Sequence, residues 1–521
     1  MTVNTIRNLL QRAAKFYPDK TVLIEKNKRV SYKELLKKVN QIAKYFSTLD
    51  LPKGSRIGIY SNKCTDQVIA ILSILSTRFV IVPITRFYKQ DQLKHIIDDC
   101  DIKCIITDHK KIKSIRELNY QGKIVSYEPI DKEIVSFEEI YKCYDDDYEC
   151  AIKSHDNAVI TYSYATESFS KGIVISHRNL TDGARIVSKY LNLQKEDVIS
   201  GVLSFNLDYG LNQIFCALYN KSTLAIHKYI LAGDFFNHLI NDKVTILPVM
   251  PIHISQMFDD EPHRIPPADS LKNVRAMTSS GGNLTSKMLK NIEKHFPYTK
   301  FYSMHGLTEA FRSTYLEPEQ LKIRPTSIGK AVPDVDIYII NDKGEECKPR
   351  EIGELIHRGA CIYKGYWNAP QESQKRFKSI KILKKVINLE GELNDEIVVT
   401  SGDYVYKDEE GYIYFVSRKD DMIKTRGYRV SPYEIESIIY DNIGEISQCA
   451  VFSIENEKIE EEIVLVYSSK KPIAKNSILF ELKKHMPNYM IPSIIVYKEY
   501  IPLQYGKIDK NKLREEVLEA I

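Results

Sequence analysis

The sequence has no long block of charge of one sign and no paired cysteine motif. Its 74 Lys and Arg residues nearly balance its 69 Asp and Glu residues, and the net charge of +5 is spread along the chain. This distribution gives no electrostatic reason to expect nucleic-acid binding. The nine cysteines are scattered without a CxxC pair or a nearby group of histidines, so neither a disulfide framework nor a zinc site is predicted.

Also missing is an uninterrupted apolar run long enough to cross a membrane. The most apolar stretch, VIAILSILSTRFVIVPI, is interrupted by Thr77 and Arg78 and fits a helix followed by a buried strand. The first residues, MTVNTIRNLLQRAAKFYP, form an amphipathic helical pattern, unlike a secretory signal with a basic start and an apolar core. We therefore expect a cytoplasmic protein.

Internal repeats, low-complexity tracts and proline-rich linkers are absent as well, yet the chain is too long for one compact core. Its 521 residues, 43% hydrophobic and 27% charged, are typical of a globular enzyme with two or more domains. From about residue 30, helical periodicity alternates with short β-branched runs such as RIGIY, FVIVPI and KCIITD. This alternation predicts an α/β fold, with two βα-layered subdomains in roughly the first 400 residues.

The pattern changes after about residue 335. The strand-like pieces DIYIIND, GELIHRG and EGYIYFVSR are separated by turn residues instead of long helices, which predicts a small β-rich subdomain. Beyond Arg418 we expect helices around PYEIESIIY and SILFELKKHM, and strands around QCAVFSI, EEIVLVYS and SIIVYKE. The sequence thus predicts an N-terminal domain over residues 1–417 and a small, mobile α+β C-terminal domain over residues 418–521.

Four motifs occur in an informative order along the chain. They are SMHGLTE (303–309), TSGD (400–403), SRKDDMIKTRGYRVSPYEIE (417–436) and PLQYGKIDKNKL (502–513). Together they closely resemble the adenylate-forming superfamily, which contains acyl-CoA synthetases, adenylation domains of non-ribosomal peptide synthetases, and firefly luciferases. The resemblance extends from about Val30 to the C-terminus. It implies a large domain that holds ATP and an acid, and a C-terminal domain that rotates between two half-reactions.

Two residues of these motifs carry charges suited to phosphate chemistry. The resemblance implies that Lys507, expected in a loop after a strand, is the catalytic cation that meets the carboxylate and the α-phosphate. Alone, it would be one more solvated lysine. Glu309, beside Thr308, is implied to bind Mg²⁺, a hard cation that prefers oxygen ligands. Outside this context the two residues would be a capping pair at the start of a helix.

Further residues are implied by the same resemblance to hold the nucleotide. Asp403 matches an aspartate that accepts hydrogen bonds from both ribose hydroxyls, although a turn aspartate is the alternative. Arg418 matches an arginine that assists at the nucleotide, and His305 stands where the family usually has a tyrosine against adenine. A glycine-rich loop lets backbone approach the adenine face. The remaining nucleotide-site residues are Gly281, Gly282, Asn283, Gly306 and Thr308.

The segment after Arg418 is implied to serve the second half-reaction. Asp420 aligns with the hinge residue whose backbone torsions absorb the rotation of the C-terminal domain. Gly427 and Arg429 lie just beyond it, and the glycine is implied to let a pantetheine arm pass closely. This segment would serve thioester formation, whereas Lys507 would serve adenylate formation.

The phosphate loop departs most from the family pattern, which is TSGSTGKPKG. Here it is SYATESFSKG, in which Ala165 and Ser168 replace both internal glycines. Glu167 adds a negative charge beside a triphosphate, which costs electrostatic energy unless the side chain points away or binds the metal. Slow or altered ATP use is the expected consequence. The residues that keep the chemistry of the loop are Ser163, Thr166, Lys171 and Gly172.

The segment SFNLDYGLNQIF (204–215) aligns with the acid pocket of the family. Asp208 falls where amino-acid-activating members bind the α-ammonium group, although it would otherwise be a turn or helix-capping aspartate. Arg312 falls on the expected pocket wall. The two charges would neutralise each other or bind a substrate with an ammonium group, a second carboxylate, or both. DYGLNQ and GLTEAFRSTYL also resemble bacterial acyl-CoA ligases associated with exosortase gene clusters.

Two functions are compatible with these residues. The first is an AMP-forming ligase that uses ATP and Mg²⁺ to activate a carboxylic or amino acid, and then transfers the acyl group to the pantetheine thiol of CoA or a carrier protein. The second is a catalytically weakened relative that binds an acid, a nucleotide or a carrier protein as a scaffold or sensor. The altered phosphate loop motivates the second, and the intact motif around Lys507 favours the first.

Overall fold

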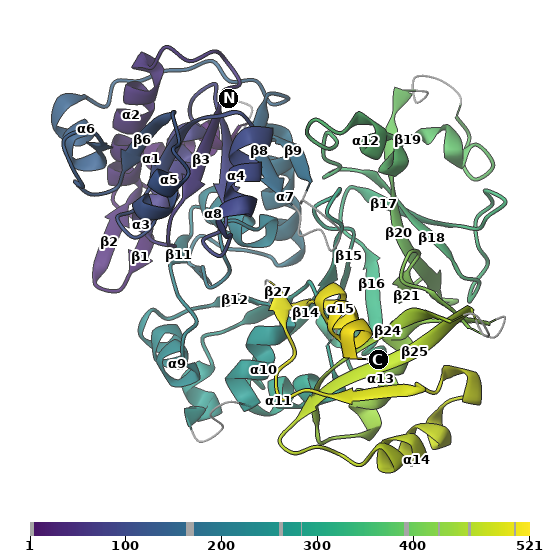
Figure 1. Ribbon diagram of the computed structural model, residues 1–521. Helices are drawn as coiled ribbons and strands as arrows, with labels where there is room; N and C mark the ends of the chain where they lie inside the picture. The colour runs from purple at the N-terminus through teal and green to yellow at the C-terminus, as the bar shows by residue number, and fades with distance from the viewer. Residues whose placement is uncertain are drawn as a thin grey trace.

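A computed structural model of the 521-residue chain gives the arrangement of its helices and strands (Figure 1). The residues that the structure describes are 5–162, 171–259, 264–282, 284–389, 395–425, 428–456, 460–504 and 507–520. None of the described helices combines the length and apolar character needed to cross a membrane.

The first α/β layer is built around a seven-stranded sheet, counted over the described residues, in the order β7-β6-β5-β3-β4-β8-β9. All neighbouring pairs are parallel except β8 and β9. The strands are β3 (Arg56–Tyr60), β4 (Val80–Ile84), β5 (Ile102–Thr107), β6 (Lys123–Ser126), β7 (Val135–Ser136), β8 (Asn157–Tyr162) and β9 (Gly172–Ser176). The helices are α1 (Ile6–Phe16), α2 (Tyr32–Thr48), α3 (Thr65–Ile74), α4 (Gln90–Asp99), α5 (Ile112–Glu117) and α6 (Phe137–Cys143).

The apolar stretch near residue 70 forms α3 followed by the fully buried strand β4, as the interruption at Thr77 and Arg78 predicts. Several helices begin where a serine can cap them. The hydroxyl groups of Ser31, Ser136 and Ser176 each accept the backbone N–H three residues on, at the starts of α2, α6 and α7. Such capping satisfies donors that the first helical turn leaves free, which explains where these helices start.

The second α/β layer has parallel strands in the order β13-β12-β10-β11-β1, with β14 beside β13. The strands are β1 (Thr21–Glu25), β2 (Lys28–Ser31), β10 (Val198–Ser200), β11 (Thr223–Ala225), β12 (Ile246–Val249), β13 (Ala276–Ser279), β14 (Lys300–His305) and β15 (Thr314–Leu316). The helices are α7 (His177–Tyr190), α8 (Asp208–Asn220), α9 (Ala232–Asn241), α10 (Pro251–Asp259), α11 (Ser286–His295), η2 (Ala268–Leu271) and η3 (Pro318–Gln320). Thus β1 and β2 are the first two strands in the sequence but belong to this second layer.

The β-rich segment is continuous with the second layer, because β16 pairs antiparallel with β15. The sequence indicates a separate small subdomain at this point, whereas the strands extend one long sheet through shared backbone hydrogen bonds. Its elements are β16 (Ser327–Ala331), β17 (Val335–Ile340), β18 (Gly353–Gly359), α12 (Pro370–Arg376), β19 (Phe377–Ser379), η4 (Ile380–Leu383), β20 (Ile397–Lys407) and β21 (Ile413–Arg418).

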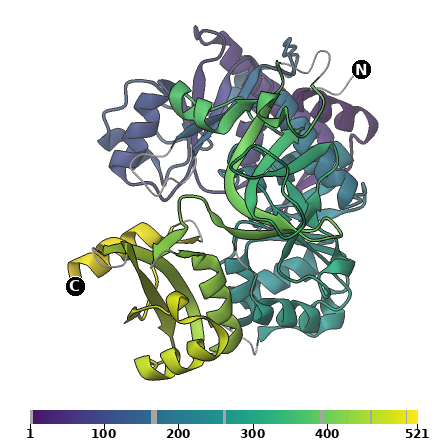
Figure 2. The same cartoon turned by 90° about the vertical axis from the view of Figure 1, so that its right-hand side faces the viewer.

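The elements after β21 gather in a lobe beside the second sheet (Figure 2). A five-stranded sheet, as far as the described residues define it, has the order β23-β22-β25-β24 with β26 on β25, and two hydrophobic clusters within 423–517 form its core. The elements are β22 (Ile423–Thr425), β23 (Tyr428–Val430), α13 (Pro432–Asn442), β24 (Ile446–Asn456), β25 (Glu460–Ser469), α14 (Lys475–His485), η6 (Asn488–Met490), β26 (Ile494–Tyr497), β27 (Leu503–Gln504), β28 (Lys507–Ile508) and α15 (Lys510–Ala520). The predicted α/β fold with a smaller α+β part is confirmed.

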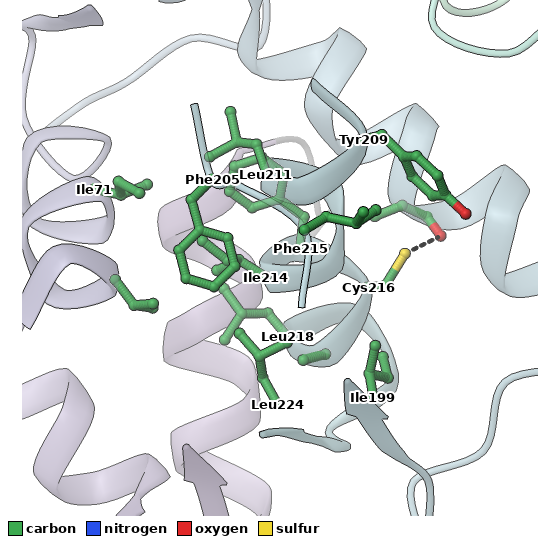
Figure 3. Close-up of a cluster of buried hydrophobic side chains, with 14 of the residues drawn as sticks. Ile71, Ile199, Phe205, Tyr209, Leu211, Ile214, Phe215, Cys216, Leu218 and Leu224 are labelled. Atoms are coloured by element: carbon green, nitrogen blue, oxygen red, sulfur yellow. Dashed lines mark hydrogen bonds between the residues drawn. The ribbon is translucent and has the colours of Figure 1, made fainter. Parts of the chain in front are cut away.

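The largest hydrophobic cluster surrounds α8 in the second layer. Leu211, Ile214, Phe215 and Leu218 pack there together with Phe205 (Figure 3). Burial of these side chains is the main driving force for the position of the helix. The helix in turn places its first residues at the acid pocket predicted from the sequence.

Candidate active site

The predicted nucleotide residues lie on one side of a cleft of about 820 Å³. The opposite side is formed by C-terminal elements, including α13 and the hairpin of β27 and β28. The predicted residues that line the cleft are Gly281, Gly282, His305, Gly306, Asp403 and Arg418. Residues from three separate motifs therefore line one cleft, and those at Gly281 and His305 lie at the carboxyl ends of β13 and β14, where ligands of α/β sheets commonly bind.

Asp403 is the most enclosed of these residues. It lies within β20 and is fully buried, so the alternative of a turn aspartate is wrong. His305 Nε2 donates to its Oδ2 at 3.0 Å, and Arg418 Nε lies 3.0 Å from its Oδ1. Burial opposes the charged form, but the hydrogen bond from His305 and the charge of Arg418 outweigh it, so the pKa of Asp403 lies below its ordinary value of 3.8.

The second oxygen of Asp403 is buried and lacks a hydrogen-bond donor in the described part of the chain. Although Arg418 lies within ion-pair distance, its N–H is not aligned, and Oδ1 has no hydrogen-bond donor among the residues that the structure describes. A buried carboxylate oxygen without a donor is costly. The cleft therefore presents a charged acceptor that two vicinal hydroxyl groups of a ligand would satisfy.

The glycine-rich loop follows β13, as the sequence predicts. Gly281 has a φ of +87°, a left-handed conformation that glycine adopts without steric cost. A Cβ at Gly282 would lie 3.3 Å from Pro251 Cγ, so the backbone passes close to the start of α10. Asn283 lies outside the described residues.

Glu309 lies in the connection between β14 and β15. Residues 306–313 contain no helix, so a helix-capping role for Thr308 and Glu309 is wrong. Thr308 is exposed, whereas Glu309 is only 7% exposed, and its Oε1 accepts a hydrogen bond from the Tyr366 hydroxyl. The described part of the chain contains no group of three His, Cys, Asp or Glu side chains that would hold a metal. A divalent ion at Glu309 would therefore depend on ligand oxygens, as Mg²⁺ commonly does.

Lys171 lies over the ring of Tyr366, the residue that donates to Glu309. Its ammonium group is 5.8 Å from the ring centroid and 2.7 Å from Glu372 Oε2. The hydrogen bonds from Lys171 and Lys375 lower the pKa of Glu372 to about 2. Sequence analysis did not single out Tyr366, which is 57 residues from Glu309 and has no local spacing signal. Ser163 and Thr166 lie outside the described residues.

Lys507 begins strand β28, and its backbone pairs with Gln504 of β27. The sequence predicted a loop at Lys507, whereas the residue lies in the two-residue strand β28. Leu503 and Ile508, in the same hairpin, line the cleft, which places the backbone of Lys507 at its edge. The short strand thus brings the predicted catalytic lysine to the face opposite Asp403.

The residues predicted for the second half-reaction lie elsewhere. Arg429 is in β23, opposite Lys424 of β22, and the described residues of these two strands do not line the cleft. Gly427 lies outside the described residues. Asp420 lies in the turn after β21 with its side chain 84% exposed, and its nearest ion-pair partner is Arg376 Nη2 at 3.7 Å.

The two charges of the predicted acid pocket do not neutralise each other. Asp208 is the first residue of α8, accepts the Tyr209 N–H at 2.6 Å, and lines a cavity of about 10 Å³. Arg312 is buried and stacks on Tyr209 and Phe311, and the described residues show no ion pair between Asp208 and Arg312. Asp208 does not cap α8, because the N-cap residue is Leu207 and no side chain caps the helix; Asp208 is instead an acidic residue of the first turn. The guanidinium group of Arg312 lies among aromatic rings.

Several known proteins are similar in sequence to this chain over almost its whole length. Tyrocidine synthase 1 of Brevibacillus parabrevis is 25% identical over 99% of this chain, and gramicidin S synthase 1 of Brevibacillus brevis is 25% identical over 98%. The chain spans only 45% and 44% of the length of these two relatives. A long-chain-fatty-acid–CoA ligase of Bacillus subtilis is 24% identical over 99% of this chain and 95% of its own length.

Solved structures share the fold. A crystal structure of an anthranilate CoA ligase in complex with anthranoyl-AMP matches with a TM-score of 0.86 at 20% identity, covering 99% of this chain and 98% of that chain. A benzoate CoA ligase from Burkholderia xenovorans matches with a TM-score of 0.84 at 20% identity, covering 98% and 99%. At this identity the likeness concerns the fold alone.

A sequence model of the family described as AMP-binding enzyme matches residues 10–367, well over half of the 521 residues. The match covers both α/β layers and the motif of Glu309, and it confirms the resemblance found in the motifs. The chain therefore belongs to the AMP-binding enzyme family.

Proposed function

We propose that this protein uses ATP to activate a carboxylic or amino acid as its acyl-adenylate and then transfers the acyl group to a pantetheine thiol. The observation that carries this proposal is that buried Asp403, with one unsatisfied oxygen, lines the same cleft as the hairpin of Lys507. The relatives are named as peptide synthases and a fatty-acid–CoA ligase, and one structural neighbour holds anthranoyl-AMP. These names support an acid-activating reaction.

The residues on one side of the cleft are the proposed nucleotide-binding residues. Asp403 accepts the ribose hydroxyls, assisted by Arg418, while His305 and the loop at Gly281 and Gly282 pack against adenine. Further proposed contacts come from Ser163, Thr166, Lys171, Asn283, Gly306 and Thr308. Glu309 is the proposed ligand of Mg²⁺, which supplies charge neutralisation at the phosphates when bound.

The proposed first step is an in-line displacement at phosphorus. A carboxylate oxygen of the acid forms a bond to the α-phosphorus of ATP, the bond from that phosphorus to the bridging oxygen breaks, and pyrophosphate leaves with that oxygen. Lys507 is the proposed cation that stabilises the charge on the α-phosphate oxygens in the transition state. The acid lies between Asp208 and Arg312 in this proposal.

The proposed second step requires residues 418–521 to turn as a unit about Asp420. Hydrophobic clusters confined to 423–517 support a separately packed unit, and the exposed turn at Asp420 supports a hinge. Hydrogen bonds between the two parts include those from Ser286 Oγ to Asp441 Oδ1 at 2.6 Å and from Ser431 Oγ to the Val416 carbonyl at 2.5 Å, and a rotation would have to break such contacts. Gly427 and Arg429 would then face the acyl-adenylate, and the thiol would attack its carbonyl carbon and displace AMP.

The thiol belongs to CoA or to a carrier protein in this proposal, and both are compatible with the cleft because they share a pantetheine arm. A cytoplasmic location and the resemblance to exosortase-associated ligases remain predictions from the sequence. The alternative, a weakened scaffold or sensor, rests on Ala165 and Ser168 in the phosphate loop. These residues lie outside the described residues.

A mass-spectrometric screen for acyl-AMP tests the proposal. Purified protein is incubated with Mg²⁺-ATP and pooled amino, hydroxy and fatty acids, and hydroxylamine traps the activated acyl group. We expect Lys507→Ala to abolish the product, whereas Lys512→Ala, at an exposed position of α15, retains it. Adenylation that survives Lys507→Ala would contradict the assigned catalytic role.

Pyrophosphate exchange separates the enzyme from the scaffold. Tight AMP binding without exchange, in the presence of every acid pool, would favour the scaffold. Exchange that increases in the double variant Ala165→Gly and Ser168→Gly would instead identify a working enzyme slowed by its phosphate loop.

A further inference from the structure

Arg312 is a buried cation without an anionic partner. Its relative exposure is 4%, the described residues place no carboxylate within ion-pair distance of it, and its Nε has no hydrogen-bond partner among them. Removing a guanidinium group from water without a compensating charge is costly, so natural proteins seldom leave one in this state. The group therefore requires an anion that the described protein does not supply.

The immediate neighbours of Arg312 are neutral. The guanidinium carbon lies 4.3 Å from the ring centroid of Tyr209 and 4.5 Å from that of Phe311, and Tyr190 offers a hydroxyl group. Stacking on aromatic rings stabilises the cation, yet it leaves the N–H groups at the edge of the guanidinium plane without a charged acceptor. An anion approaching this edge would complete the site.

Arg312 lies against Gly306, one of the residues that line the cleft. Its φ is +139°, a conformation that is strained for a residue other than glycine. A Cβ at Gly306, which lines the nucleotide cleft, would lie 3.5 Å from Arg312 Nη1. The missing side chain at Gly306 thus leaves the guanidinium group directly behind the wall of the cleft.

Asp208 faces the same region from α8. It lines a cavity of about 10 Å³ together with Phe311 and Tyr363. Burial raises the pKa of Tyr363, and the charge of Asp208 raises it further, whereas Arg312 opposes the increase. One negative and one positive side chain therefore influence the same buried tyrosine without pairing with each other. Arg312 is not among the residues that line this cavity, and the lining side chains other than Asp208 are uncharged.

We propose that Arg312 binds a second carboxylate of the substrate, so that the activated acid is a dicarboxylic acid. This inference rests on the proposed function, because the other carboxylate must remain free to attack the α-phosphorus. A guanidinium group presents two parallel N–H donors that match the two oxygens of a carboxylate. The dicarboxylate thereby supplies the negative charge that Arg312 lacks.

Acids and their matched amides test the proposal with the unaltered protein. Acyl-AMP is measured by mass spectrometry for succinate against succinamate, aspartate against asparagine, and glutamate against glutamine. Each amide keeps the size of its acid but loses the second negative charge. We expect at least one acid to be preferred over its amide by about 30-fold or more in kcat/KM, the usual penalty for an unpaired buried charge.

Variants of Arg312 identify the source of that preference. Arg312→Met should reduce the acid-to-amide ratio to within a fewfold of one, and Arg312→Lys should retain part of it. Arg324→Met is the control, because the Arg324 side chain is 11% exposed but pairs with Asp408 and Glu410 and does not itself line the cleft. That control should leave the ratio unchanged even where it lowers stability.

The results separate this inference from the proposed function. Acyl-AMP formed from monocarboxylic acids, with no preference for any second carboxylate, overturns the role of Arg312 but leaves acid activation intact. No acyl-AMP from any acid overturns the proposed function itself. If Arg312→Met does not fold, the acid-to-amide ratio of the unaltered protein still decides the matter.

Discussion

Tyr366 donates a hydrogen bond from its hydroxyl group to Oε1 of Glu309. The tyrosine lies between β18 and α12, and the glutamate lies in the connection after β14, so two distant segments meet at the proposed metal ligand. Burial raises the pKa of Tyr366, and the charge of Glu309 raises it further, so the hydroxyl remains a donor. Tyr366 therefore orients the carboxylate of Glu309, the proposed metal ligand.

We expect Tyr366→Phe to lower the free energy of unfolding by about 1–3 kcal/mol, because a buried carboxylate oxygen loses its donor. The loss should become smaller in saturating Mg²⁺-ATP, since a bound metal ion would satisfy Glu309 in place of the hydroxyl. Urea unfolding with and without Mg²⁺-ATP measures both values.

Tyr414→Phe is a matched control for this variant. The Tyr414 hydroxyl also donates to a carboxylate, Asp408 Oδ2 at 3.1 Å, but neither residue lines the cleft. Its effect on stability should be the same with and without Mg²⁺-ATP. If Tyr366→Phe behaves in the same way, Glu309 does not hold the metal.

Asp403→Asn should weaken AMP binding by about 10- to 150-fold, the usual value of hydrogen bonds to a charged group. The amide keeps the shape of the side chain but loses the charge that accepts from His305 and faces the ribose in our proposal. Isothermal calorimetry with AMP measures the change. Asp408→Asn, outside the cleft, serves as the control, and equal affinities of the two variants would contradict a ribose contact at Asp403.

The pH dependence of stability provides a separate test of Asp403. Since its folded-state pKa lies below the ordinary value of 3.8, its ionised form contributes stability above that pH, which is lost as the pH falls through the folded-state pKa. The difference in unfolding free energy between the unaltered protein and Asp403→Asn should be constant near neutral pH and decrease below pH 3.8. A difference that grows on acidification would contradict the lowered pKa.

The residues on the proposed nucleotide side of the cleft could be predicted from the sequence because they lie in short motifs. His305 and Glu309 share one motif, and Asp403 lies in another, so their identity could be recognised without knowledge of the fold. The alternation of helical and β-branched segments likewise predicted both α/β layers, since periodicity reflects which side of each element is buried. Local patterns were sufficient for these features.

Contacts between residues far apart in the sequence could not be predicted from local patterns. The parallel pairing of β1 with β11 joins residues such as Leu23 and Leu224, and no spacing in the sequence encodes it. The contact between Tyr366 and Glu309 has the same origin. The family resemblance predicted that Arg312 lies in the wall of the acid pocket. Whether Asp208 neutralises its charge depends on how the side chains pack around Tyr209, and the sequence does not give that packing.

The last prediction concerns the hinge. Asp420→Pro fixes φ near about −65°, so the turn after β21 can no longer absorb a large rotation. Because Leu503 and Ile508 already line the cleft, we expect acyl-AMP formation to remain within a fewfold of normal. Thioester formation should fall by at least about tenfold, since the segment of Arg429 cannot reach the cleft.

Asp420→Ala is the control for this variant, because it removes the carboxylate near Arg376 and leaves the backbone torsions free. Single-turnover measurements of acyl-AMP and of the CoA thioester, for whichever acid is activated, distinguish the two steps. If Asp420→Pro slows adenylation and thioester formation equally, or if Asp420→Ala has the same effect as proline, the torsions at residue 420 do not carry the rotation. The hinge would then lie elsewhere between β21 and β22.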